Sequence, residues 1–534
     1  MFKQLMGYIG QYRKYFILAP LLVVGESVAE LILPYLMGKL VSDGVGTGNI
    51  PYMYTTGLIM ILVAALGIVD GIFAAKFSAK ASQGFGYNLR EALFQKVQTF
   101  SFADVDKFST ASLVTRCTTD VKQLQQTAME LTRVLIRAPS LLFVSLFFCF
   151  RMNLRLSVVF LIAIPTLLAV VLIIVHFTTY LFEVMQTKID NLNASVQENL
   201  IAIRVVKSFV RVAFEKVKFK KANDDLMRTS IMATIRLSIM QPATMMVLYG
   251  TTLAIYWFGG HMVGNGTLQD GQLLSFITYV NQILMSVMMF SMVLMGLTRA
   301  RACGRRVTEV LNHVPDISDS REDRDDGAPI RGEIEFKNVS FRYNDGSKDC
   351  IHNISFKINQ GETFAIIGAT GTGKSTLVNL IPRFYDVTDG EILLDGVNIQ
   401  DYSQEDIQNK ISVAPQKAIL FKGDIQSNIA YGAKEEIADD DPRIEKALKV
   451  AKADFVYDLE KGIHAEVAQG GTNFSGGQKQ RLSIARAVFK DAEVVIFDDT
   501  FSALDYKTDM LVRKELKENL NDTTVIIVAQ RIGT

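Results

Sequence analysis

The chain has 534 residues, which is too long for one ordinary domain and suits two or three. Its formal net charge is +1, so no overall field draws it to nucleic acid or to an acidic partner. Hydrophobic residues make up 49% of the chain, a high share for a soluble protein, and most of the excess lies before Arg299. We therefore expect a membrane half followed by a soluble half.

An amphipathic stretch, 2–15, opens the chain. It predicts a helix on the inner membrane surface, with Lys3, Arg13 and Lys14 near anionic lipid. Six apolar segments follow, each long enough for a bilayer core, which needs roughly 20 residues. They cover approximately 16–37, 52–73, 134–151, 156–182, 239–263 and 271–298. The last has no charged side chain, which favours membrane spans over buried helices of a soluble protein.

The connections between the spans alternate in length and in charge. The second, 74–133, and the fourth, 183–236, are long, polar and helix-like, while the others are short. Lysine and arginine crowd the fourth connection, whereas 264–269 contains neither. By the positive-inside rule, the N-terminus and both long connections are cytoplasmic, and an even number of spans returns the chain to the cytoplasm. Residues 1–314 thus form a predicted membrane domain in contact with lipid.

Four charged residues lie in or near the spans. Glu26 and Glu30 are in mid-span and share one helical face, where they would bind cationic cargo or line a wet cavity. Asp70 and Arg137 lie nearer span ends, and we expect them to reach the membrane interface. Methionines also crowd the sixth span, with Phe276, Tyr279 and Phe290 nearby, and this pattern suits either a cavity for lipophilic compounds or plain helix packing. They are Met285, Met288, Met289, Met292 and Met295.

A soluble α/β domain is predicted over 330–534, after an acidic linker at 315–329. Its first motif fits the phosphate-loop pattern GxxxxGK[ST], between an apolar strand, 363–367, and a helix, 376–381. The glycines let backbone N–H groups turn toward phosphate oxygens, Lys374 reaches the β and γ phosphates, and the Ser375 hydroxyl ligates Mg²⁺. The residues predicted to contact ATP here are Gly368, Thr370, Gly371, Thr372, Gly373, Lys374, Ser375 and Thr376.

A second phosphate-site strand, 494–498, has four apolar residues and ends in Asp498. Ligands of parallel sheets bind at the carboxyl ends of the strands, so Asp498 is predicted to hold Mg²⁺ through water.

Between these two segments, Asn473-Phe474-Ser475-Gly476-Gly477-Gln478 resembles the signature motif of the ATP-binding-cassette (ABC) family, with Phe474 where leucine is usual. Further motifs are similar to the same family along the whole chain. Tyr343 matches the aromatic residue that stacks on adenine, and Gln416 matches the glutamine that senses Mg²⁺ and faces the membrane domain. Asp505 lies in the segment that matches the loop crossing the dimer interface, and 381–386 is typical of exporters.

The resemblance implies a six-helix membrane domain followed by an α/β phosphate-loop ATPase domain, which would continue beyond Thr534. In this family two ATPase domains close head to tail over two ATP molecules. The signature residues, Ser475, Gly476, Gly477 and Gln478, would then bind the γ-phosphate held by the partner. By family position, 101–107 and 207–211 would be short contact helices, the second reaching across to the partner.

Two catalytic positions depart from the family. Asp499 stands where the glutamate that activates the attacking water is usual, and Gln530 stands where a histidine is usual. Aspartate is one methylene shorter than glutamate, and a displacement of about 1 Å can slow a reaction on the order of 10²-fold. Glutamine cannot take or give a proton near neutral pH. Together with Gln416, these residues predict a site that binds MgATP but hydrolyses it poorly.

The leading hypothesis is one subunit of a heterodimeric multidrug exporter in a bacterial inner membrane. The partner half-transporter would supply the glutamate and the histidine, and the cargo would be a hydrophobic small molecule. The alternatives are a homodimeric lipid or peptide exporter that uses Asp499 as a weak base, and an ATP-gated channel. The six spans exclude a soluble ATPase that acts on nucleic acid.

Overall fold

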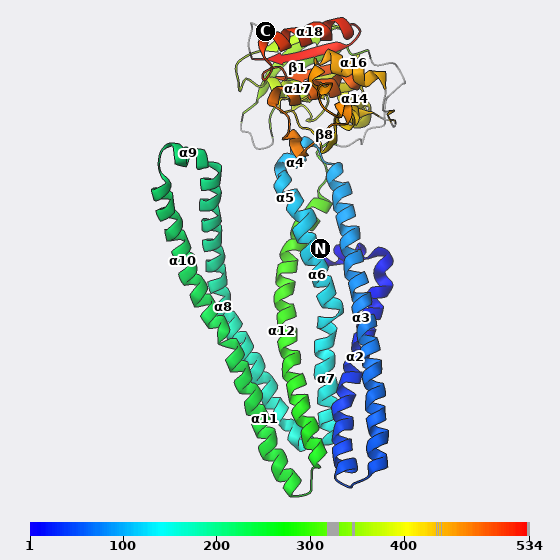
Figure 1. Ribbon diagram of the computed structural model, residues 1–534, viewed down its shortest axis with the longest axis vertical. Helices are drawn as coiled ribbons and strands as arrows, with labels where there is room; N and C mark the ends of the chain where they lie inside the picture. The colour runs from blue at the N-terminus through cyan, green and yellow to red at the C-terminus, as the bar shows by residue number, and fades with distance from the viewer. Residues whose placement is uncertain (318–330, 344–347, 434, 436, 439–440, 531–534) are drawn as a thin grey trace. The chain divides into compact units, whose positions relative to one another are not determined.

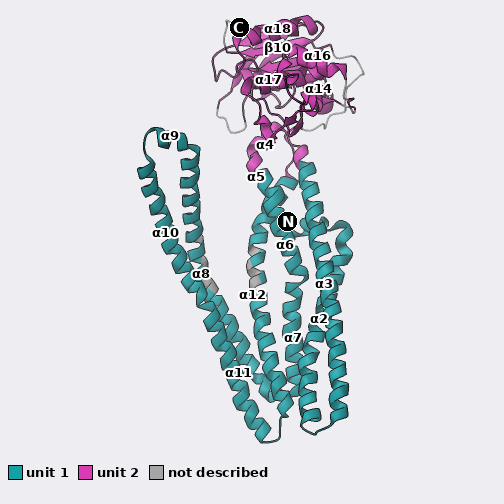
Figure 2. Cartoon of the chain, viewed as in Figure 1, with its two compact units in different colours: residues 1–96, 114–312 teal, residues 97–113, 313–534 magenta. Residues whose placement is uncertain are grey.

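The computed structural model describes residues 1–317, 331–343, 348–433, 435, 437–438 and 441–530. They form two compact units, 1–96 with 114–312 and 97–113 with 313–534 (Figure 2). Residues 318–329, which make up most of the predicted linker 315–329, lie outside the described residues. The first unit is helical, and the strands belong to the second, which confirms the predicted fold class.

Long helices build the first unit, and α3 and α5 extend into the second (Figure 1). The helices are α1 Phe2–Gly7, α2 Arg13–Lys39, α3 Ile50–Gln98, α5 Thr110–Thr115, α6 Val121–Thr132, α7 Val134–Met152, α8 Leu154–Ile201, α9 Ile203–Ser208, α10 Val212–Ser238, α11 Met240–Gly264 and α12 Asp270–Asn312. Within the described residues, six helical segments are long and apolar enough to cross a membrane, which confirms the predicted spans.

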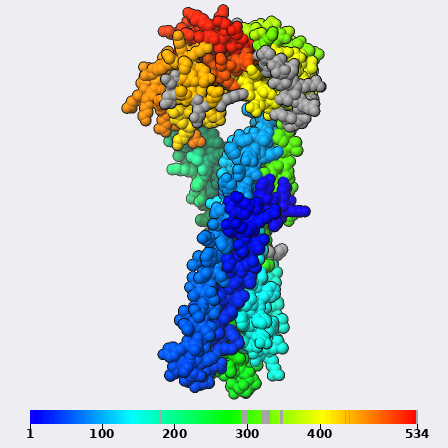
Figure 3. All heavy atoms as spheres, turned by 90° about the vertical axis from the view of Figure 1, so that its right-hand side faces the viewer, coloured from blue at the N-terminus to red at the C-terminus, as the bar shows by residue number. Residues whose placement is uncertain are grey.

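The N-terminal segment is not the single predicted helix over 2–15. α1 ends at Gly7, and Gly10 has a φ of +51° that interrupts the helix before α2 begins. Leu5 is buried, and its Cδ1 lies 3.2 Å from where a Cβ on Gly304 of α12 would be. Leu5 therefore packs on protein, whereas Phe2 and Met6 of α1 are exposed. Figure 3 shows these first residues, in dark blue, on the surface of the unit.

Buried aromatic side chains hold the spans together. Phe160 of α8 and Phe276 and Tyr279 of α12 are fully buried, and the Tyr279 hydroxyl donates to the Leu31 carbonyl oxygen of α2 at 2.7 Å. Packing and hydrogen bonds of this kind drive helix association in membranes. Phe276 and Tyr279 thus fit the packing interpretation of the sixth span, whereas Met285 is exposed.

Arg137 does not simply reach toward the membrane interface, as its place near a span end suggested. Its guanidinium bonds to Glu26 and, at 2.8 Å, to Glu30 Oε2, so α7 is tied to α2. Gln282 of α12 donates to Glu30 Oε1 at 3.2 Å. A charge inside a membrane span is costly unless it is paired, and here two carboxylates share one arginine. The two carboxylates predicted to meet cationic cargo are therefore already paired.

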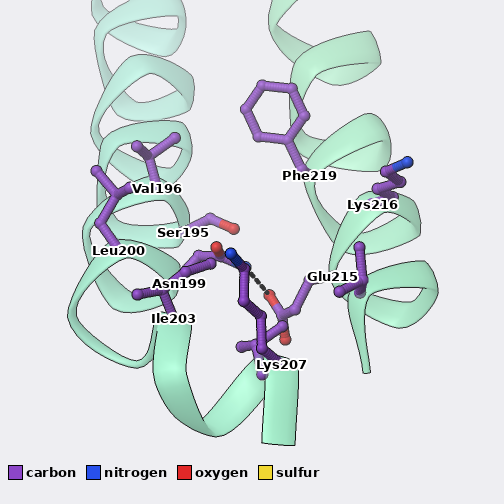
Figure 4. A pocket seen from close by; sticks show the side chains of 11 residues that line it. Ser195, Val196, Asn199, Leu200, Ile203, Lys207, Glu215, Lys216 and Phe219 are labelled. Atoms are coloured by element: carbon purple, nitrogen blue, oxygen red, sulfur yellow. Dashed lines mark hydrogen bonds between the residues drawn. The ribbon is translucent and has the colours of Figure 1, made fainter. Parts of the chain in front are cut away.

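The α8–α10 hairpin forms an arm of the first unit, with α9 at its tip (Figure 1). Lys218 Nζ lies 2.6 Å from Glu198 Oε2, which ties α10 to α8 near the tip. A mostly apolar hollow of about 330 Å³ lies at this tip. Asn199 donates to Glu215 there at 3.3 Å, and Figure 4 shows the side chains that line the hollow. The predicted contact helix at 207–211 is wrong in its bounds, because Val210 adopts a φ of +55° and the helix ends earlier, at Ser208.

The second unit joins sheets and helices into one α/β core. Its strands are β1 Ile334–Phe341, β2 Ile351–Ile358, β3 Thr363–Ile367, β4 Asp389–Leu394, β5 Val397–Asn398, β6 Ile411–Ala414, β7 Gly423–Asp424, β8 Glu466–Val467, β9 Val494–Asp498 and β10 Thr524–Ala529. Its helices are α4 Phe102–Phe108, α13 Lys374–Leu380, α14 Gln404–Lys410, α15 Ile425–Ile429, α16 Pro442–Val450, α17 Gly476–Phe489 and α18 Tyr506–Asn519.

A parallel sheet with the order β3-β10-β9-β6 forms the centre of this core, and an antiparallel sheet β2-β1-β4-β5 accompanies it. All five residues of β9 are buried, as expected for a strand covered on both faces. Because the four central strands run in parallel, their carboxyl ends meet at one edge of the sheet.

Candidate nucleotide-binding site

The carboxyl edge of the parallel sheet gathers the predicted phosphate-site residues. The phosphate loop follows β3, Asp498 and Asp499 lie at the end of β9, and Gln530 follows β10. Gln416 comes two residues after β6. Ligands of open parallel sheets bind at this edge, so the topology places these groups where one nucleotide can meet them all.

Two glycines shape the phosphate loop, and any other residue at either position would strain the backbone. Gly371 and Gly373 have φ of +83° and +87°, a region that favours glycine. A Cβ on Gly373 would also lie 2.9 Å from Ile351 Cδ1. Lys374 Nζ donates to the carbonyl oxygens of Gly368 and Ala369, both at 2.8 Å, so the ammonium lies over its own loop. Phosphate oxygens are stronger acceptors for this group than carbonyl oxygens.

A hydroxyl and a carboxylate meet where a magnesium ion is expected. Ser375 Oγ donates to Asp498 Oδ1 at 2.9 Å, which brings two hard oxygen ligands together. Burial, together with the neighbouring charge of Asp499, raises the pKa of Asp498, while Ser375 and Lys374 oppose that rise. A divalent cation would relieve this unfavourable burial of a negative charge, so the residues present fit Mg²⁺.

The position of the water-activating base is occupied by a carboxylate that two amides hold. Gln530 Nε2 donates to Asp499 Oδ2 at 2.6 Å, and Gln416 Nε2 donates to the same oxygen at 3.1 Å. The Thr370 hydroxyl in turn donates to Gln530 Oε1 at 3.3 Å. Asp499 is 7% exposed and has a φ of +50°. The structure thus brings together all three predicted catalytic residues, and it connects them to the phosphate loop.

Tyr343 lies beside the phosphate loop, at the place expected for an adenine-stacking residue. Its ring is 38% exposed, and its hydroxyl lies 3.0 Å from Thr376 Oγ1, with either atom as the donor. Thr376 is buried in this contact. The ring packs edge-on against Phe341 and Tyr385, at centroid distances of 4.8 and 5.4 Å. These neighbours fix the ring while leaving part of it open.

The signature residues form the start of α17. Ser475 caps this helix: its hydroxyl accepts from Gln478 N–H at 3.3 Å, and Gln478 Oε1 accepts from Ser475 N–H at 2.9 Å. This reciprocal pair is a capping box, which leaves the N–H groups of Gly476 and Gly477 at the helix start. Gly477 lies next to Ala503 of the predicted dimer loop, because a Cβ on Gly477 would be 3.3 Å from the Ala503 carbonyl oxygen.

Asp505, predicted in the dimer loop, caps α18. Its side chain accepts from the Thr508 N–H at 3.0 Å and from the Thr508 hydroxyl at 2.7 Å. These hydrogen bonds lower the pKa of Asp505, so the residue stays ionised.

Sequence reasoning missed two contacts around this site. One is the Thr370–Gln530 bond, and the other is a hydrogen bond from Tyr385 to Asp106 of α4 at 2.9 Å. Both join residues more than a hundred positions apart. The motif at 381–386 was the only signal for the second, and it did not name a partner.

Comparisons with known proteins agree with this geometry. A family model described as "ABC transporter transmembrane region" matches residues 16–287, and one described as "ABC transporter" matches residues 351–502. An uncharacterized ABC transporter ATP-binding protein of Mycobacterium tuberculosis is 35% identical over 529 residues, which are 99% of this chain and 91% of that protein. An ATP-dependent lipid A-core flippase of Pseudoalteromonas translucida is 30% identical over 543 residues, covering 100% of this chain and 91% of the flippase.

A solved structure shares the fold. The bacterial Atm1-family ABC exporter with ATP bound matches with a TM-score of 0.78 at 24% identity, covering 98% of this chain and 92% of that one.

Proposed function

Because the chain belongs to the ABC transporter family, as an exporter-type half-transporter with a transport ATPase domain, we propose that it is the slowly hydrolysing subunit of a heterodimeric multidrug exporter. In this proposal the chain binds MgATP at its own phosphate loop and retains it. A second half-transporter contributes the site that turns over. ATP hydrolysis drives a hydrophobic or amphipathic small molecule across the membrane.

The contact between Gln530 and Asp499 carries the proposal. A general base must accept a proton from the attacking water, and Asp499 Oδ2 already accepts from Gln530 at 2.6 Å and from Gln416 at 3.1 Å, so two amide donors compete with that water for the carboxylate. The shorter side chain also withdraws the carboxylate from the place of the usual glutamate, and a displacement of about 1 Å can slow catalysis on the order of 10²-fold. Gln530 itself has no proton to exchange near neutral pH.

Magnesium binding remains intact in this proposal. Ser375 and Asp498 would hold the ion, the latter through water, and Gln416 would sense it. The ion would supply charge neutralisation at the β and γ phosphate oxygens. Lys374 would bind the same phosphates, which suits a site that keeps ATP for long periods.

The signature supports a partner with a working site. Ser475 and the first N–H groups of α17 keep the capped geometry that a γ-phosphate requires, so this chain would complete the partner's ATP site. In a homodimer, both sites would instead contain Asp499 and Gln530. The tip of the arm exposes Phe209 and Val210, at 72% and 84%, which suits a contact with the partner chain.

The proposed cargo follows from an open pocket of about 660 Å³ in the first unit. Three methionines, Met129, Met285 and Met289, line it together with polar and charged side chains that suit an amphipathic molecule. These include Asn281, Gln282, Glu130, Arg133 and Arg137. Methionine is flexible and polarisable, so such a wall adapts to varied lipophilic molecules. The lysine and arginine content of the fourth connection supports a cytoplasmic N-terminus and a cytoplasmic ATPase domain.

The nucleotide that remains bound tests the retained-ATP step. The purified full-length chain is incubated with MgATP and passed through a desalting column, and the bound nucleotide is then analysed. We expect intact ATP from the natural chain. We expect the Asp499→Glu/Gln530→His double variant to hydrolyse bound ATP to ADP at least about 10-fold faster. The longer side chain at 499 would reach the attacking water, and the imidazole at 530 could exchange a proton. Mostly ADP on the natural chain would contradict the proposal.

A further inference from the structure

A cluster of aromatic rings in the second unit joins the adenine side of the nucleotide site to α4. The Tyr385 ring packs edge-on against Tyr343 at 5.4 Å and lies 5.6 Å from Phe341. On its other side, Phe384 stacks on Phe102 of α4 at 4.3 Å. The two neighbouring residues of this motif therefore contact both the predicted adenine residue and the predicted contact helix.

The Tyr385 hydroxyl ties the aromatic cluster to α4 through one hydrogen bond. It donates to Asp106 Oδ2 of α4 at 2.9 Å. Burial and the neighbouring Asp106 carboxylate raise the pKa of Tyr385, so the hydroxyl keeps its proton and remains a donor at physiological pH. This is a charge-assisted hydrogen bond, which is stronger and more directional than one between neutral groups.

α4 is also held at its start. Asp104 is fully buried, and its carboxylate accepts from the backbone and the hydroxyl of Ser101, both at 2.9 Å. It also contacts His313 Nε2 at 2.5 Å and accepts from Asp316 N–H at 3.3 Å. His313 is the residue that follows α12. A shift of α4 would therefore carry the start of the segment that leaves the last membrane helix.

A pocket of about 560 Å³ lies between these groups. Tyr343 and Tyr385 line it on one side, and Asp106 and Lys107 of α4 line it on another. A base stacked on Tyr343 would thus press on a ring that contacts α4 directly. The ring contact between Tyr343 and Tyr385 and the hydrogen bond from Tyr385 to Asp106 would carry such a displacement to α4 beside the pocket.

We infer that Tyr385 is a positioning residue that transmits occupancy of the adenine site to α4, through its ring contact with Tyr343 and its hydroxyl bond to Asp106. This inference rests on the proposed ATP site. It adds a second route between nucleotide and membrane domain, separate from the route through Gln416, which begins at the γ-phosphate and Mg²⁺. The two routes differ in what they detect: Tyr385 detects the base, and Gln416 detects the phosphates.

That difference defines the ligands of the test. Hydrogen exchange is followed by mass spectrometry on the full-length chain in detergent, with peptides covering 100–109 and the phosphate loop. MgATP and magnesium tripolyphosphate are compared, because both carry three phosphates and only ATP carries a base. We expect both ligands to protect the phosphate loop. We expect only ATP to slow exchange in 100–109, by at least about threefold.

Four variants separate the hydroxyl bond from general packing. Tyr385→Phe keeps the ring and removes the donor, and Asp106→Ala removes the acceptor. Asp106→Asn keeps an oxygen acceptor and serves as the conservative variant. Tyr457→Phe removes a hydroxyl from an exposed tyrosine of the same unit and serves as the matched control.

The first two variants are expected to abolish the ATP response of 100–109 while the ATP affinity, measured by titration, changes less than about threefold. Their double variant should behave like either single one, because both remove the same bond. Asp106→Asn and Tyr457→Phe should keep the response. A full response in Tyr385→Phe, or an equal response to tripolyphosphate in the natural chain, would overturn the relay. If no ligand protects the phosphate loop, the proposed ATP site fails, and the relay fails with it.

Discussion

At the scale of single residues, one carboxylate oxygen is the centre of the hydrogen bonds around the proposed ATP site. Asp499 Oδ2 accepts two amide hydrogens, from Gln416 and Gln530, while Gln530 also accepts from Thr370. The departures from the family at 499 and 530 are therefore not independent, since one residue holds the other. Restoring glutamate alone would leave both amide donors beside the new carboxylate. A compensating pair of changes is needed because the two residues form one hydrogen-bonded unit.

The sequence was sufficient to predict these two departures, because each stands at a fixed position in a motif. It was not sufficient to predict that they touch, since their contact depends on the neighbouring order of β9 and β10. The same holds for Arg137, whose carboxylate partners lie on a different span. The sequence alone predicts that a charged residue near a span end reaches the membrane interface. Only the packing of the helices shows whether the residue has a partner on another span.

Asp104 carries a prediction on pH at the same scale. Burial alone raises the pKa of a carboxyl group, but hydrogen bonds from His313, Ser101 and Asp316 outweigh it and lower the pKa of Asp104 below 3.8. A depressed pKa stabilises the folded state above the unfolded value, and this stabilisation is lost as the pH falls through the folded value. Asp104→Asn should therefore lower the free energy of unfolding at pH 7 by roughly 1–3 kcal/mol. We expect this loss to appear as a lower thermal midpoint of the full chain.

The difference in midpoint between the natural chain and Asp104→Asn should not shrink between pH 7 and pH 5, and it should shrink only below the ordinary value of 3.8. Fluorescence-detected unfolding over this range measures it. A difference that already shrinks near pH 6 would mean that the ionised carboxylate is not the stabilising group.

At the scale of helices and strands, the sequence predicted most elements and missed their breaks. The strand 363–367 and the strand 494–498 are β3 and β9 with the predicted bounds. β9 is buried at every residue, as its continuous apolar run predicts, whereas β3 lies at the edge of the sheet and alternates between exposed and half-buried residues. The breaks at Gly10 and Val210 were missed because each depends on one residue with a positive φ, and hydrophobic patterns do not record backbone dihedrals.

The charged group that ties α2, α7 and α12 makes a prediction about these elements. Arg137→Leu would leave Glu26 and Glu30 without their cation, and one oxygen of Glu26 is already buried without a hydrogen-bond partner among the described residues. Breaking a fully buried ion pair from one side costs roughly 3–5 kcal/mol, and we expect a smaller cost here because the side chains of Arg137, Glu26 and Glu30 are 23%, 15% and 34% exposed. We expect a clear fall in the thermal midpoint of the detergent-solubilised chain, measured by fluorescence-detected gel filtration.

The control for that change removes all three charges together. The triple variant Glu26→Gln/Glu30→Gln/Arg137→Met should be more stable than Arg137→Leu alone, since no unpaired carboxylate remains. If Arg137→Leu has a midpoint equal to that of the natural chain, the three charges do not hold the helices together.

At the scale of the whole molecule, the chain is an exporter half that needs a second half. Its family and fold follow from the matches over the membrane and ATPase regions. The order of domains and the six spans could be predicted from composition and motifs, because span length and phosphate-loop chemistry leave few alternatives. The identity of the cargo could not, because a methionine-rich wall accepts many shapes.

The ATPase rate of the full-length chain, alone and in complex with a co-expressed second half-transporter that carries the usual glutamate and histidine, tests the central claim most directly. Slow turnover alone and a rate at least about 10-fold higher in a one-to-one complex are expected, because hydrolysis would occur at the partner's phosphate loop. Turnover by this chain alone at the rate of the complex would contradict the account. Asp499 would then be a competent base, and the protein would be a working homodimer.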